Sequence, residues 1–135
     1  MPTTADVRAH ALRLGPGEDV RPWLEAWAAQ TPVPAAGVVS AVGSLTVARL
    51  RLAGAQTHRS VDGPLEIVSL CGTVGAGGAH LHAAVADPLG ACLGGHVVAG
   101  CIVHTTVELV LLELSGLAFA RTFDPATGYP ELDVD

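Results

Sequence analysis

Three histidines have the residue type and the spacing with which this chain could do chemistry. His80 and His82 stand two apart in an apolar segment, and His96 follows directly after Gly94-Gly95. In a β-strand, side chains alternate between faces, so His80 and His82 would point the same way. Three imidazoles with a fourth position left open form a reactive zinc shell, whereas a structural zinc site is closed by four protein ligands.

A turn between the second and third histidines would bring all three together. Asp87-Pro88-Leu89-Gly90 is a turn signal, and a short apolar run after it leads to His96. A hairpin folded at this turn predicts that His96 lies beside His80 and His82. Spacing alone leaves two interpretations open: a metal site, or three separate polar residues near a sheet edge.

The donor set limits the metal without selecting it, because imidazole binds zinc, copper, nickel and iron. We expect a divalent metal and favour zinc, since three histidines and a water recur in catalytic zinc shells. The open position could activate water or hold a small acidic or carbonyl ligand. Gly94 and Gly95 would let the backbone approach closely and aim His96. The three cysteines are interpreted as small core residues: Cys71, Cys92 and Cys101.

Two carboxylates in apolar strand patterns are the candidate catalytic groups. Glu66 shares a predicted face with Val68, and Glu108 shares one with His104. An ionised carboxylate rarely lies in such a setting without a partner. Each could act as a general acid or base beside the metal, or orient a ligand histidine. The alternative is a structural hydrogen bond or an arginine pair at a subunit interface, so whether the protein is an enzyme stays open.

Composition predicts one domain over residues 1–135, since a chain of this length forms a single core. Half of the residues are apolar and 15% are charged, which leaves an apolar surface that homo-oligomerisation would cover. No apolar run is long enough to span a bilayer, and the N-terminus does not resemble a signal peptide. We therefore expect no membrane partner. Three cysteines are an odd number for a disulfide framework, so we expect the protein in the reducing cytoplasm.

The charge of the chain argues against DNA as a partner. The net charge is −6, and all seven basic residues are arginines. Duplex DNA binding draws much of its affinity from neutralised phosphates, so this chain would be a poor non-specific binder. Arg49, Arg51 and Arg59 could still form a local patch. The alternative, which we favour, is that Arg49 and Arg51 mark the solvent face of one strand.

Periodicity predicts one strand, one long helix and then a run of strands. The first strand covers residues 7–14. A helix then has Asp19 as N-cap, and its apolar residues recur at helical spacing: Val20, Trp23, Leu24, Trp27 and Ala28. We expect its two tryptophans to pack on a sheet. Strand patterns follow at residues 38–52, 65–74, 79–86, 93–98, 101–114 and 117–120. Residues 72–78 are interpreted as a flexible turn that places His80, and residues 121–135 as a polar tail rich in turn residues.

Seven short motifs occur together along almost the whole chain. They are residues 12–20, 38–45, 66–73, 80–82, 94–96, 100–103 and 105–108. In this combination the chain resembles the plant and prokaryote conserved (PPC) domain, whose bacterial members are often labelled DNA-binding proteins with a PD1-like motif. The resemblance implies a compact α+β fold, in which a mostly antiparallel β-sheet is flanked by one main helix, and a homotrimeric assembly.

The resemblance also bears on function. The PPC fold is similar to that of acetolactate decarboxylase, a zinc enzyme that uses a His-x-His and a third histidine at a shorter spacing. Plant members bind DNA through AT-hooks with an Arg-Gly-Arg-Pro core, which this chain lacks. They also lack histidines matching His80, His82 and His96. The leading hypothesis is therefore a metal-binding protein that binds or acts on a small metabolite. The alternative is a DNA-binding or transcription-associated protein.

Overall fold

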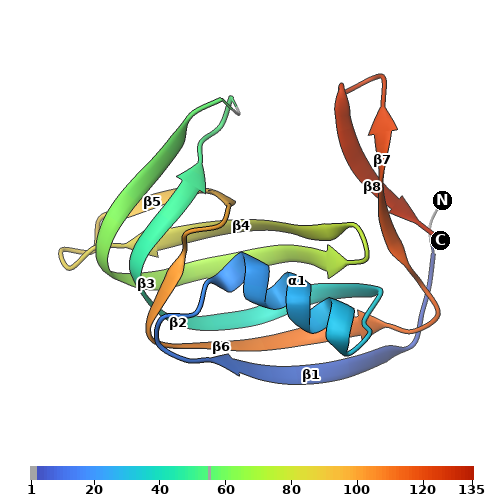
Figure 1. Cartoon of the computed structure of the whole chain (residues 1–135), viewed down its shortest axis with the longest axis horizontal. Coiled ribbons are helices and arrows are strands. Elements are labelled where there is room, and N and C mark those ends of the chain that lie inside the picture. Colours follow the sequence, from blue (N-terminus) through green and yellow to red (C-terminus); the bar gives the residue numbers. More distant parts are fainter. Residues whose placement is uncertain (1–2, 55) are drawn as a thin grey trace.

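The computed structural model describes residues 3–54 and 56–135 of the chain (Figure 1). Its elements are β1 (Val7–Leu14), α1 (Val20–Gln30), β2 (Ala35–Arg51), β3 (His58–Gly75), β4 (Gly78–Ala86), β5 (Cys92–Val97), β6 (Ile102–Leu114), β7 (Phe119–Asp124) and β8 (Tyr129–Val134). All strand pairings are antiparallel. The structure confirms the predicted α+β class, with a mostly antiparallel sheet and one helix.

The main sheet has six strands in the order β1-β6-β2-β3-β4-β5, and it curls back on itself. The last strand, β5, pairs with β4 along its length and also reaches the end of β2. This second contact pairs Leu50 with Val97 and Arg51 with His96. The curl therefore places a residue of β2 beside residues of the β4–β5 hairpin, although they are far apart in sequence.

Helix α1 covers the sheet through one apolar face. Val20, Leu24 and Ala28 recur at every fourth position and are all buried. Asp19 occupies the predicted N-cap position, but its side chain makes no capping hydrogen bond. Its carboxylate instead accepts a hydrogen bond from the backbone N–H of Gly100 at 2.9 Å. Asp19 therefore ties the start of the helix to the loop before β6.

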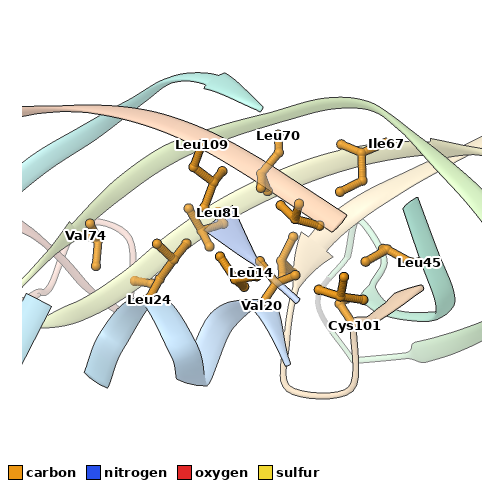
Figure 2. Packing of buried hydrophobic residues seen from close by; sticks show 14 of the residues in the cluster. Leu14, Val20, Leu24, Leu45, Ile67, Leu70, Val74, Leu81, Cys101 and Leu109 are labelled. Carbon is orange, nitrogen blue, oxygen red and sulfur yellow. The ribbon is translucent and has the colours of Figure 1, made fainter. Parts of the chain in front are cut away.

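The core lies between α1 and the curled sheet. Figure 2 shows Leu14, Leu81 and Leu109 there, and all three are buried. Trp23 and Trp27 are partly buried and pack against this core, as the sequence predicts. The buried residues are leucine and valine for the most part, so the sheet is held to the helix by apolar burial.

The C-terminal residues correct one prediction. Residues 121–135, predicted as a polar tail rich in turn residues, contain most of a separate two-stranded hairpin formed by β7 and β8. The Asp124 side chain accepts a hydrogen bond from the N–H of Ala126 at 2.8 Å, which stabilises the connecting turn. Phe119 is buried at the base of β7. Figure 1 shows the hairpin rising away from the main sheet, beyond the end of β6.

The outer side of the sheet carries exposed apolar side chains. Three valines of β2 and β3 are more than half exposed: Val39, Val42 and Val68. Val110 of β6 is also exposed, so the sheet carries apolar side chains on the outside of the isolated chain. Among the residues that the structure describes, no helix is long and apolar enough to cross a membrane.

Candidate metal centre

The strand register brings the three histidines together. His82 of β4 lies directly opposite His96 of β5, and His80 lies opposite Thr73 of β3. Leu81, between the two histidines of β4, is 1% exposed and belongs to the core. Since strand side chains alternate, His80 and His82 point away from the core toward the outside of the curled sheet. Asp87 holds the connecting turn, where its side chain accepts hydrogen bonds from two backbone N–H groups.

The glycines before His96 act as the sequence predicts. A Cβ on Gly95 would lie 2.7 Å from the carbonyl oxygen of Arg51, and one on Gly94 would lie 3.0 Å from that of Ala83. Side chains at these positions would push β5 away from β2 and β4. The two glycines therefore permit the close backbone approach that sets His96 beside His82.

The imidazoles form a compact cluster. Ring centroids are 4.3 Å apart for His82 and His96, 5.0 Å for His80 and His96, and 5.1 Å for His80 and His82. One nitrogen from each ring lies within 4.8 Å of the other two. Nitrogens bound to one tetrahedral zinc would be about 3.3 Å apart at ordinary bond lengths. Small side-chain rotations would close that difference, so the three histidines fit a divalent metal with an open position.

The surroundings of two of these histidines favour the neutral imidazole. Burial, followed by the positive charge of Arg121, lowers the pKa of His80. Burial, followed by the charge of Arg51, lowers the pKa of His96. A lowered pKa favours the unprotonated imidazole at pH 7, and only that form can bind a metal. The lowered pKa values therefore favour the imidazole form that can bind a metal cation.

A cavity of about 670 Å³ opens beside the histidines. It is lined by the three histidines, by the β7–β8 hairpin and by arginines from three elements: Arg21, Arg51 and Arg121. Sequence analysis places Arg51 on a solvent face and gives no role to the other two arginines. No local sequence signal could place these arginines at the cavity, because the curl of the sheet and the C-terminal hairpin bring them together.

The candidate carboxylates are not part of this cluster. Glu66 of β3 and Glu108 of β6 are both exposed, and neither lines the cavity. In the isolated chain they are solvated, so they do not need the partners that their apolar neighbours in sequence suggest. Glu131 of β8 is the carboxylate that lines the cavity. It lies in the segment interpreted from sequence as a polar tail.

The remaining histidines and cysteines lie elsewhere. His10 forms a 2.6 Å contact with Glu113, and His58 and His104 are exposed. The prediction of three core cysteines is wrong for two of them, since Cys71 and Cys92 are exposed. Cys71 is exposed because it lies opposite His82, on the outer side of the sheet. Burial raises the pKa of Cys101 to about 11, which makes this thiol unreactive. All three cysteines are free.

Comparison with known proteins identifies the family. Residues 1–115 match the Plants and Prokaryotes Conserved (PCC) domain, and the chain belongs to this family. The chain is 46% identical over 132 residues to the "Bifunctional protein GlmU" of Synechococcus sp. (strain JA-3-3Ab). That alignment covers 98% of this chain and 21% of the relative. The chain thus spans about a fifth of the length of the curated relatives it matches.

Solved structures agree on the fold. A hypothetical protein from Salmonella cholerae-suis is 44% identical with a TM-score of 0.95, over 98% of this chain and 96% of that one. The metal-containing protein AF0104 from Archaeoglobus fulgidus is 27% identical with a TM-score of 0.84, over 98% and 99% of the two chains. More distant neighbours, at 17% and 20% identity, are provisionally named as DNA-binding proteins, and at that identity they show the fold alone.

Proposed function

We propose that this member of the Plants and Prokaryotes Conserved domain family binds a divalent metal through His80, His82 and His96 and presents it to a small metabolite. The observation that carries the proposal is the convergence of three imidazole nitrogens within 4.8 Å at the wall of a cavity. Zinc is the favoured ion, because three histidines with an open position match its catalytic shell.

The cavity suits a small-molecule ligand. Its volume of about 670 Å³ is in the range of metabolite pockets. When bound, the metal would polarise a carbonyl oxygen or lower the pKa of a water. The chain's own residues supply the rest: neutral imidazoles hold the ion, and the arginines favour a ligand with negative charge.

Two further observations support a metal. The related protein from Archaeoglobus fulgidus, at 27% identity, is described as metal-containing. In this chain, the lowered pKa values of His80 and His96 keep both residues in the form that binds metal at neutral pH.

Elemental analysis of the chain, purified without chelators from zinc-replete medium, tests the proposal. We expect one metal per chain, and its loss in the double variant His80→Ala/His82→Ala. The matched control is His104→Ala, which removes an exposed histidine outside the cluster and should retain the metal. A metal-free wild-type protein, or equal metal in the double variant, would overturn the proposal. Circular dichroism would show that the variants are folded.

The proposal extends to a homotrimer in the cytoplasm. The exposed valines of the sheet support self-association, because an obligate interface buries an apolar surface of this kind. Three free cysteines, two of them exposed, suit a reducing compartment. DNA binding is the alternative function, and it draws support only from the names of distant neighbours with the same fold.

A further inference from the structure

The cavity beside the histidines holds arginine charge that carboxylates of the protein compensate only in part. Arg21 forms an ion pair with Glu25, with Nε and Oε1 3.0 Å apart. Within residues 3–54 and 56–135, this is the only ion pair that an arginine makes. Arg51 and Arg121 line the same cavity and have no such partner there. The cavity wall therefore offers two arginines to a ligand.

Arg51 is held directly beside the cluster. It lies opposite His96 in the pairing of β2 with β5, and directly paired residues have Cβ atoms about 4.5–5.5 Å apart. Its Nε is buried and has no hydrogen-bond partner among the described residues. A buried donor without an acceptor is unfavourable, and such groups are rare in folded proteins. Arg51 therefore has hydrogen-bonding capacity that the described part of the chain does not use, and its side chain lines the cavity.

Arg121 is also held beside the cluster. Its Nη2 donates a hydrogen bond of 3.1 Å to the Oγ1 of Thr73, which lies opposite His80. That bond uses one of the five N–H donors of the guanidinium and orients the rest. The two arginines thus flank the histidines from β2 and from β7.

We infer that Arg51 and Arg121 bind one carboxylate of a small dicarboxylic acid, whose second carboxylate reaches the metal position between the three histidines. This inference rests on the proposed metal site. The planar fork of arginine matches a carboxylate with two parallel hydrogen bonds. Because the cavity has two cationic positions, the arginine pair and the metal, a ligand with an acidic group at each end fits both.

The C-terminal hairpin brings a negative charge as well as Arg121 to the cavity. Glu131 and Tyr129 of β8 line the same cavity. The Glu131 carboxylate is close enough for its charge to oppose the lowering of the His80 pKa. With Glu131, Arg51 and Arg121 leave one net positive charge at this end of the cavity, since Arg21 is paired with Glu25. A carboxylate with a single charge balances it, and a dianionic phosphate would exceed it.

Calorimetric titration with malonate tests the inference. Acetate and inorganic phosphate serve as comparison ligands, and the metal content of every sample is measured before and after titration. We expect malonate to bind wild-type protein more tightly than either comparison ligand. Arg51→Gln and Arg121→Gln should each weaken malonate binding about tenfold, with metal content unchanged. Arg8→Gln, at an exposed arginine of β1, is the matched control and should leave the affinity unchanged.

The outcomes separate this inference from the metal site. Malonate affinity that is equal in wild type, Arg51→Gln and Arg121→Gln would overturn the carboxylate pocket, even with metal fully bound. Tighter binding of phosphate than of malonate would also overturn it. Loss of metal from the wild type would contradict the proposed function by itself. Light scattering on Arg51→Gln shows whether Arg51 instead serves assembly: a changed mass with unchanged malonate affinity would count against the inference.

Discussion

His82 and His96 face each other across β4 and β5, with ring centroids 4.3 Å apart and ring planes at 76°. Their contact depends on the backbone pairing of the two strands, because neither ring makes a hydrogen bond to another residue in the described part of the chain. The hairpin thus presents two metal ligands at a fixed spacing, and His80 completes the set from two residues away. Whatever changes the pairing of β4 with its neighbours should change metal binding.

Metal affinity should depend on pH with a defined sign. Protons compete with the metal for imidazole, so affinity falls as pH falls through the histidine pKa values. Those of His80 and His96 are lowered from 6.5, so affinity should persist to a more acidic pH than for ordinary histidines. Zinc competition titrations between pH 5 and 8 would measure this dependence. The pH at which zinc affinity has fallen halfway should lie below the value expected for histidines with unshifted pKa values. An affinity that declines already above pH 7 would contradict the prediction.

The stability of the fold should depend on the core residue that lies between two of the metal ligands. Leu81 is 1% exposed and anchors the strand that carries His80 and His82. Leu81→Ala should lower the free energy of unfolding by about 2–5 kcal/mol, through lost burial and the cavity that remains. Urea denaturation measures the loss. Leu89→Ala is the matched control, because Leu89 is 93% exposed and should change stability by less than about 0.5 kcal/mol. Equal effects of the two substitutions would refute this account.

A glycine on β3 fixes the position of β4. Gly72 has a φ of 139°, and a Cβ there would collide with the carbonyl group of His80. Gly72→Ala should therefore displace the strand and weaken zinc binding at least tenfold, besides destabilising the fold. Gly116→Ala separates collision from backbone strain, since Gly116 has a φ of 79° with nothing near its Cβ position. That control should cost about 1 kcal/mol and leave zinc affinity intact. Unchanged zinc binding in Gly72→Ala would show that the glycine is dispensable.

Sequence was sufficient for the histidine cluster because its geometry is local. The alternation of β4 sets His80 and His82 on one side, and the turn at Asp87 folds β5 back within a few residues. The helix was equally predictable, since Val20, Leu24 and Ala28 have helical spacing. These features depend on contacts between segments that are close in the chain.

The cavity could not be predicted, because its parts come from distant segments. Arg51 meets His96 only through the pairing of β2 with β5, which needs the whole sheet to curl. Arg121 and Glu131 belong to a hairpin of which the sequence predicts only the start, at residues 119 and 120, as a strand. The exposure of Glu66 could not be predicted for a related reason: apolar neighbours in sequence suggest burial, but the outer side of this sheet is apolar and exposed as well.

DNA binding should be weak or absent at physiological salt. The net charge is −6, and of the seven arginines Arg21 is paired with Glu25 while Arg51 and Arg121 line the cavity. Few cations remain to replace the counterions of a duplex. Fluorescence anisotropy with a mixed-sequence duplex should show no binding at micromolar protein. Sub-micromolar, sequence-selective binding at that salt would favour the alternative function, and an arginine patch formed by assembly would then be its source.

The exposed valines of the sheet should mediate assembly. Val42 of β2 and Val110 of β6 are exposed on neighbouring paired strands, where an obligate interface would cover them. Light scattering at micromolar concentration should give three times the chain mass of 13.7 kDa. Val42→Asp should shift the protein toward the chain mass, because it would bury an unpaired charge in the interface. Val7→Asp, at an exposed valine where β1 begins, should leave the mass unchanged. A wild-type monomer would refute the trimer, and a Val42→Asp variant that stays trimeric would place the interface on another surface.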